Sequence, residues 1–230
     1  MALYAIGDLH LSIGTGKSME IFGHRWENYM EKIKEGFKIV QPDDTVVLCG
    51  DLCWGMTMEQ AKDEFGYIND LPGHKILLKG NHDYWWTTAS KAYRAFEEYG
   101  YEDMRILHNN CYFYGDDVAI CGTRGWFFEE EKGDEHDAKV MHREIMRLET
   151  SLKAAGDKRK FVFLHYPPKY QAYECREILD LFREYDVEQC IYGHIHDKGC
   201  AYAFNGTFEN TKFRLVSADH VFFIPQKIMD

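Results

Sequence analysis

Hydrophobic and polar positions follow two alternating patterns along the first hundred residues. Short apolar runs predict buried strands, and longer segments with apolar residues at helical spacing predict helices between them. The predicted strands are 3–6, 45–48 and 75–78, and the predicted helices are about 25–40, 58–71 and 88–99. Strands that alternate with helices in this way are typical of parallel strands joined by right-handed crossovers.

The pattern changes after residue 110, where two strands follow each other directly. The runs Cys111–Tyr114 and Val118–Cys121 are separated by Gly115-Asp116-Asp117, which is typical of a hairpin. The later predicted elements are a charged helix over 134–155, a strand over 161–164, a helix over 174–185, a strand over 189–192 and, from Cys200 onward, two or three antiparallel strands with a turn at Asn205-Gly206. Mixed strands with helices outside them indicate an α/β fold with two packed sheets.

The organisation of the chain predicts one domain. Its 230 residues contain no internal repeat, no low-complexity segment and no linker rich in proline, glycine or serine. A domain of this length buries about 70–75% of its unfolded surface, which is enough for one sizeable core. We therefore expect a single domain over residues 1–230.

The balance of charges is acidic, with 27 lysines and arginines against 38 aspartates and glutamates and a formal net charge of −11. Nucleic-acid polymers and anionic membranes attract clustered positive charge, so this balance disfavours both as partners. A small phosphorylated substrate is compatible with it, because such a molecule experiences only the local field of its cleft. The sequence does not indicate an oligomeric state.

The cysteines and the amino-terminal segment predict a cytoplasmic location. The seven cysteines are odd in number, scattered and without a CxxC pair, which is typical of reduced thiols and not of a disulfide framework. The first residues enter an apolar strand without the basic region and cleavage site of a signal peptide. No stretch approaches 18 consecutive apolar residues, so no membrane span is expected.

Acidic, amide and imidazole side chains, which are the types that can bind metal ions, follow several of the apolar runs. They are Asp8 and His10, Asp51, Asn81 with His82 and Asp83, His165, and His194 with His196. The spacings of 43 residues from Asp8 to Asp51 and of 30 residues from Asp51 to Asn81 each fit one strand–helix–strand unit. Because the carboxyl ends of parallel strands line one crevice, we expect these residues to converge there.

The donor set favours a pair of divalent metal ions. A carboxylate can bridge two cations, and two ions about 3.5–4 Å apart can share a hydroxide and clamp both oxygens of an in-line phosphoryl displacement. Imidazole with carboxylate and no thiolate favours Mn²⁺, Fe or Zn²⁺ over Ca²⁺ or a cysteine-rich structural zinc site. We expect two such divalent ions as cofactors.

In these motifs the sequence resembles the calcineurin-like metallophosphoesterases, whose pattern is DxH…GD…GNH[DE]…H…GHxH. The matching residues, in the same order, are Asp8-Leu9-His10, Gly50-Asp51, Gly80-Asn81-His82-Asp83, His165 and Gly193-His194-Ile195-His196. The resemblance implies a mixed-strand β-sandwich flanked by helices. It also implies hydrolysis of a phosphate ester by attack of a metal-bridging hydroxide.

The resemblance also implies a role for each matching residue. Asp8, His10 and His196 would hold the first ion, and Asn81, His165 and His194 would hold the second. Asp51 would bridge the two ions. His82 would not bind metal, and would instead protonate the leaving-group oxygen or stabilise the transition state.

The segment after the second motif departs from the protein serine/threonine phosphatase branch, which carries GDxVDRG there. Trp54 replaces the aspartate that orients the catalytic histidine in that branch, and Gly55 replaces the arginine. This disfavours the protein-phosphatase branch and leaves the orienting partner of His82 open. Asp83 is adjacent to His82, but an N-cap or support of the metal ligands suits its position as well as catalysis does.

Arg124 lies between glycines after a predicted strand and is a candidate for binding a substrate phosphate. The alternative for Arg124 is a surface ion pair with the acidic run 129–131.

The run 14–18 is similar to the end of a P-loop motif, but Leu11 occupies the position of the first glycine of that motif. We interpret it as a loop, from which Lys17 can reach substrate.

Three tryptophans follow the motifs directly. Trp54, Trp85 and Trp86 either form an aromatic wall for a flat group of the substrate or pack beneath the site. The charged stretch from 134 to 159 is interpreted as a solvated helix face.

The sequence therefore predicts a metal-dependent hydrolase of a phosphate mono- or diester in a small substrate. A nuclease of the same family is an alternative, but it needs a basic groove that this acidic chain does not indicate. A second alternative is a non-catalytic metal-binding interaction scaffold. Such a scaffold is expected to have lost some metal ligands, whereas all seven ligand positions are filled here. An oxygenase or a proton-relay site would leave Asn81 and the second pair of histidines unexplained.

Overall fold

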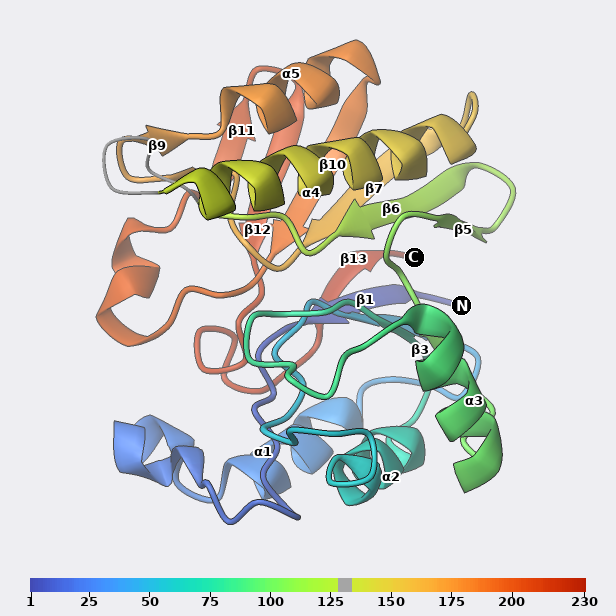
Figure 1. Cartoon of the computed structure of the whole chain (residues 1–230), viewed down its shortest axis with the longest axis vertical. Coiled ribbons are helices and arrows are strands. Elements are labelled where there is room, and N and C mark those ends of the chain that lie inside the picture. The colour runs from blue at the N-terminus through green and yellow to red at the C-terminus, as the bar shows by residue number, and fades with distance from the viewer. Residues whose placement is uncertain (128–133) are drawn as a thin grey trace. The chain divides into compact units, whose positions relative to one another are not determined.

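The computed structural model describes residues 1–127 and 134–230. The chain divides into two compact units, each with its own sheet and its own core. Unit 1 comprises Met1–Ile106 and Val216–Asp230, and unit 2 comprises Leu107–Leu215. Figure 1 shows the strands and helices of both units. The single domain expected from the sequence over residues 1–230 stays a prediction.

The sheet of unit 1 has five strands in the order β13-β1-β2-β3-β4. The strands are β1 (Leu3–Ile6), β2 (Thr45–Leu48), β3 (His74–Leu77), β4 (Met104–Ile106) and β13 (Gln226–Met229). The first four run parallel, and β13 pairs antiparallel with β1. The loops that leave β1, β2 and β3 therefore start from the same edge of the sheet.

Three α-helices and two short 3-10 turns complete unit 1. They are α1 (Tyr29–Phe37), α2 (Lys62–Asp70), α3 (Ala89–Tyr99), η1 (Met19–Phe22) and η2 (His24–Trp26). Each helix buries apolar side chains in the core of the unit, such as Phe37 of α1, Phe65 of α2 and Phe96 of α3.

Two of these helices begin later than the sequence predicts. The helix expected from residue 25 begins at Tyr29, because residues 24–26 form a 3-10 turn and Asn28 adopts a left-handed conformation with φ of 51°. The helix expected from residue 58 begins at Lys62. The third starts as predicted, where the Thr88 side chain accepts a hydrogen bond from the backbone of Lys91.

The main sheet of unit 2 has six strands in the order β11-β12-β10-β7-β6-β5. They are β5 (Cys111–Tyr114), β6 (Val118–Thr123), β7 (Arg159–Leu164), β10 (Val187–Tyr192), β11 (Gly206–Phe208) and β12 (Thr211–Leu215). The four central strands run parallel, and the two edge strands pair antiparallel with their neighbours. A small hairpin of β8 (Lys169–Tyr170) and β9 (Tyr173–Glu174) accompanies the sheet.

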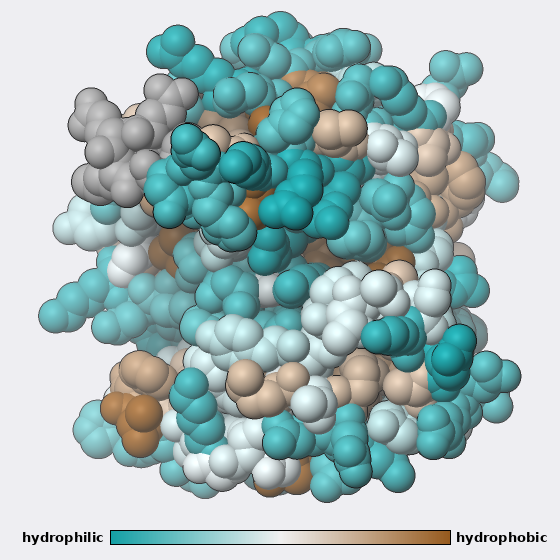
Figure 2. Space-filling view, viewed as in Figure 1, coloured by the Kyte–Doolittle hydropathy of each residue, from teal (hydrophilic) through white to brown (hydrophobic). Residues whose placement is uncertain are grey.

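Two helices pack on the core of unit 2. Helix α4 (Glu135–Ala154) matches the charged helix predicted over 134–155, and it begins with a capping box at Asp134. Its Leu148 and Leu152 are buried, while its outward face is hydrophilic (Figure 2). Helix α5 (Arg176–Glu184) buries Ile178 and Phe182.

The carboxyl-terminal strands differ from the expectation of an antiparallel group with a turn at Asn205-Gly206. Gly206 is the first residue of β11, and the turn lies at 209–210, where Glu209 has a φ of 51°. The side chain of Asn205 instead accepts a hydrogen bond from the backbone of Leu215. Strand β12 pairs parallel with β10, and β13 belongs to the sheet of unit 1.

The architecture confirms the predicted fold class, because the chain is a mixed α/β protein with two mixed sheets flanked by helices. In the described ranges, no helix combines the length and the apolar character needed to cross a membrane.

Candidate metal centre

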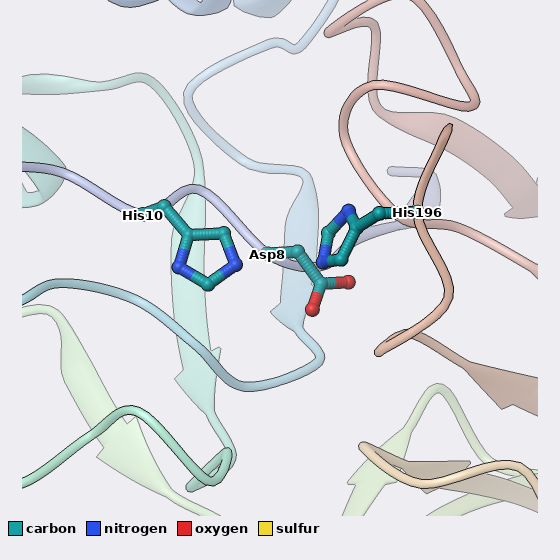
Figure 3. A group of neighbouring side chains, drawn as sticks. All are labelled: Asp8, His10 and His196. Carbon is teal, nitrogen blue, oxygen red and sulfur yellow. The ribbon is translucent and has the colours of Figure 1, made fainter. Parts of the chain in front are cut away.

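The loops after β1 and β2 bring two carboxylates and an imidazole together in unit 1. Asp8, His10 and Asp51 are 0%, 2% and 1% exposed. His10 Nε2 lies 3.7 Å from Asp51 Oδ2, and Asp8 has ligand atoms within 4.8 Å of those of both other residues. Figure 3 shows Asp8 and His10 extending from the segment that leaves β1. The convergence expected for these three residues is therefore present.

The backbone at these residues is unusual. Asp8, His10 and Asp51 have φ angles of 60°, 46° and 51°, in the left-handed region that residues other than glycine seldom adopt. Backbone hydrogen bonds hold this conformation, from Asp8 N to Gly50 O at 2.8 Å and from His10 N to Asp51 O at 2.9 Å. Strained backbone maintained by its surroundings is typical of functional sites.

The loop after β3 packs directly on Asp51. The backbone N–H of His82 donates to Asp51 Oδ1 at 2.7 Å. A Cβ atom at Gly80 would lie only 2.0 Å from the same oxygen, so glycine is required for this approach. The loop that carries Asn81 and His82 is thereby fixed beside the carboxylate of Asp51.

Asp83 connects the loop after β2 to the loop after β3 through hydrogen bonds of its side chain. Its buried carboxylate accepts hydrogen bonds from the backbone N–H groups of Leu52, Cys53 and Gly80, at 2.9, 3.3 and 2.7 Å, and from Trp85 Nε1 at 2.9 Å. These bonds connect the loop after β2 to the loop after β3. Of the roles left open for Asp83, support of the site is the one that these contacts favour.

Asp83→Ala is expected to lower the free energy of unfolding by at least about 3 kcal/mol, because four buried donors lose a charged acceptor. Urea denaturation of the metal-free protein measures the loss. Asp43→Ala, at an exposed turn of the same unit, is the control and should change stability by less than about 0.5 kcal/mol. Equal small effects of the two substitutions would contradict the anchoring role of Asp83.

The charge of the cluster suits a cation. Two carboxylates this close in a buried place repel each other, and a bound divalent cation offsets both charges. Cys53 lies nearby, but burial and the negative charge of Asp83 raise the pKa of its thiol well above the ordinary value, so it stays a neutral thiol. Oxygen and imidazole nitrogen therefore remain the donors, and this set fits Mn²⁺, Fe or Zn²⁺.

The remaining histidines of the motifs lie in unit 2. His165 follows β7 and His194 follows β10, which are neighbouring strands, and His196 lies two residues further along. His194 Nδ1 is 3.2 Å from His165 Nε2. Two imidazole nitrogens bound to one ion at about 2.0–2.1 Å have a similar separation, so this pair also fits a metal ion. His194 has a φ of 72°, in the same left-handed region as the candidate ligands of unit 1.

Arg124 is tied to His165 through the backbone, because its carbonyl oxygen accepts hydrogen bonds from the N–H groups of His165 and Tyr166, both at 3.0 Å. Its guanidinium stacks on Trp126, with Cζ 4.6 Å from the ring centre. Its Nη2 lies 3.6 Å from an oxygen of the buried Glu144. The acidic run 129–131, considered as its partner, lies outside the described residues.

The aromatic residues after the motifs divide between the two roles considered. Trp85 is 1% exposed and packs against Phe65, so it belongs to the core beneath the loops. Trp86 is partly buried and packs on the same core. Trp54 instead stacks on His10, with ring centres 5.1 Å apart, and the ammonium of Lys17 lies 3.4 Å from its ring centre.

Two residues of the site were missed by the sequence reasoning. Tyr84 lies beside His82, with its hydroxyl 3.2 Å from His82 Nδ1. Glu144 is 1% exposed and accepts a hydrogen bond from Thr123 Oγ1 at 2.6 Å. Tyr84 directly follows the GNHD motif, and this position could have indicated a contact with His82. Glu144 is one of many charged residues along a predicted helix, so the sequence does not distinguish it from the others.

Comparison with known proteins gives one family and several similar folds. The sequence profile described as calcineurin-like phosphoesterase matches residues 1–198. No curated protein matches the chain.

Three solved structures share the fold at low sequence identity. Phosphopantetheinyl hydrolase from Mycobacterium tuberculosis has 14% identity and a TM-score of 0.61, covering 94% of this chain and 88% of that one. A Thermus thermophilus protein has 15% identity and a TM-score of 0.54, with 85% and 82% covered. A protein of unknown function from Aquifex aeolicus has 15% identity and a TM-score of 0.53, with 98% and 95% covered.

Proposed function

The chain belongs to the calcineurin-like phosphoesterase family, and from this premise we propose that it is a hydrolase of phosphate mono- or diesters that works with two divalent metal ions. The observation that carries the proposal is the buried cluster of Asp8, His10 and Asp51, held in left-handed backbone at one sheet edge. Two buried carboxylates beside an imidazole fit a cation far better than they fit a structural role.

The assignment of ligands follows the family motifs. On that assignment Asp8, His10 and His196 would hold one ion, Asn81, His165 and His194 would hold the other, and Asp51 would be shared between them. The distance of 3.2 Å between His194 Nδ1 and His165 Nε2 supports their binding to one ion. The closeness of Asp51 to both Asp8 and His10 supports its central position.

Bound ions of this kind polarise the phosphoryl oxygens and activate the attacking water. The chain itself orients the reacting groups. Asp51 accepts the backbone N–H of His82, so the residue proposed to protonate the leaving oxygen is held beside the metal ligands. Arg124 is the proposed clamp for substrate phosphate, because its Nε is buried and has no hydrogen-bond partner among the described residues.

The proposed substrate is a small phosphorylated molecule. The net charge of −11 opposes a long polyanion. Two divalent cations would outweigh the negative charges of Asp8 and Asp51, so the loaded centre would attract a small anion. One of the similar structures is a phosphopantetheinyl hydrolase from Mycobacterium tuberculosis, which is compatible with a small substrate.

Arg124→Met is expected to raise KM for an aryl phosphate about 10-fold or more, because a charge-assisted bond to phosphate is lost. Arg147→Met is the matched control, since Arg147 pairs with the same Glu144 at 2.5 Å. Steady-state kinetics of both variants with Mn²⁺ measure the difference. Equal KM values in the wild type and Arg124→Met would remove Arg124 from substrate binding.

Metal analysis tests the proposed centre. After chelation and reloading with Mn²⁺, about two ions per chain are expected, and one or none would contradict the dinuclear centre. Two ions without hydrolysis of any phosphate ester would favour the non-catalytic scaffold. Cleavage of DNA or RNA in preference to small esters would favour the nuclease.

A further inference from the structure

The imidazole of His82 lies among three other rings of unit 1. Its centre is 4.5 Å from Trp54, 5.6 Å from His10 and 6.0 Å from Tyr84. The planes of His82 and Tyr84 are nearly perpendicular, at 78°, and that of Trp54 is tilted by 46°. The ring is therefore restricted by aromatic contacts on several sides.

Tyr84 contacts His82 through polar atoms as well. The Tyr84 hydroxyl lies 3.2 Å from His82 Nδ1, and the backbone N–H of Tyr84 donates to the His82 carbonyl at 2.9 Å. The same short turn therefore fixes the backbone and one ring nitrogen of His82. Because the hydroxyl contacts Nδ1, it restricts the direction in which the imidazole ring of His82 can face.

Trp54 is a rigid wall for this ring. Its indole is 7% exposed and stacks on His10 with an interplanar angle of 22°. Its backbone N–H donates to the carbonyl of Leu11 at 3.0 Å, and the Lys17 ammonium covers its ring at 3.4 Å. Stacking on His10 and the cation–π contact with Lys17 restrain the indole, and the backbone bond fixes the segment that carries it.

Trp54 occupies the position that holds the orienting aspartate in the protein-phosphatase branch, and an indole has no acceptor for a hydrogen bond. We propose that Trp54 and Tyr84 together replace that aspartate as the positioning residues of His82. Trp54 supplies the steric wall, and Tyr84 supplies the hydrogen bond at Nδ1. This inference rests on the proposed function, in which His82 assists departure of the leaving group.

The dependence of the rate on the leaving group tests this positioning role. Protonation of the leaving oxygen matters little for nitrophenolate and greatly for an alkoxide. Tyr84→Phe should therefore lower kcat about 10-fold or more for an alkyl phosphate and less than about 3-fold for the nitrophenyl ester. Trp54→Leu should also lower kcat for the alkyl phosphate more than kcat for the nitrophenyl ester. Trp54→Phe, which keeps an aromatic ring, should have rates much closer to those of the wild type.

Tyr101→Phe is the matched control, because its hydroxyl donates to the carbonyl of Lys62 at 3.1 Å in the same unit. It should leave both rates unchanged. Equal losses for the two esters in Tyr84→Phe would overturn the proposal, and so would a change in KM alone, which would make Tyr84 a substrate contact. Absence of wild-type turnover would overturn the proposed function itself and this inference with it.

A second measurement does not depend on turnover. In the metal-free protein, the ¹⁵N chemical shift of His82 Nδ1 should change in Tyr84→Phe and stay constant in Tyr101→Phe, since only the first loses the hydrogen bond. An unchanged shift in Tyr84→Phe would show that the hydroxyl does not hold this nitrogen, and would contradict the proposal.

Discussion

Asp51→Asn is expected to lower kcat/KM for an aryl phosphate by about 10³-fold while the fold survives. The amide is nearly the same size as the carboxylate, and its oxygen can still accept the backbone N–H of His82. Only the negative charge of the proposed bridging ligand is lost. Steady-state kinetics with saturating Mn²⁺ measure the effect.

The stability of the metal-free protein provides a second readout for Asp51→Asn. Removal of one of two neighbouring buried carboxylates relieves repulsion with Asp8, so the metal-free variant should be at least as stable as the wild type. Its gain in Tm on addition of Mn²⁺ should shrink, because binding weakens.

Asp44→Asn is the matched control, since Asp44 is a buried carboxylate just before β2 that accepts the backbone N–H groups of Ala2 and Gln41. It should leave kcat/KM unchanged. A wild-type rate in metal-loaded Asp51→Asn would contradict the proposed role of Asp51.

His82→Ala is expected to lower kcat by about 10²- to 10⁴-fold for a phosphate ester with a poor leaving group. His82 is partly exposed, and its backbone N–H still donates to Asp51 when the ring is removed, so the loops should keep their conformation. The rate should be measured on protein loaded with metal, together with its metal content, which should stay at the wild-type value.

His74→Ala is the control for this variant, because His74 is the exposed first residue of β3 and pairs with Asp103. It should have wild-type kinetics. Near-wild-type rates in metal-loaded His82→Ala would remove His82 from the mechanism.

Several strands could be predicted to the residue, including 3–6, 45–48 and 111–114, because each is a short apolar run with a glycine directly after it or one residue further on. Helix starts were less predictable, since the left-handed backbone at Asn28 leaves no mark in hydrophobic spacing. The turn at 209–210 was missed because Asn205-Gly206, four residues earlier, is the stronger turn signal in the sequence.

The candidate ligands could be predicted because metal binding requires particular donor groups at strand ends. The roles of Asp83 and Tyr84 could not, because they depend on which backbone donors and ring atoms the loops bring near them. Arg124 was a candidate because it is a charged residue after a strand, and its role in binding substrate stays a prediction. Its contact with Glu144 joins residues 20 positions apart and could be seen only in the fold.

Hydrolysis of aryl phosphate monoesters and diesters by metal-stripped and Mn²⁺-loaded protein tests the central claim most directly. The account predicts that Mn²⁺ restores cleavage of at least one of the two esters, and that Asp51→Asn lowers the restored activity about 10³-fold. No cleavage of either ester by wild-type protein shown to hold both ions would contradict the claim.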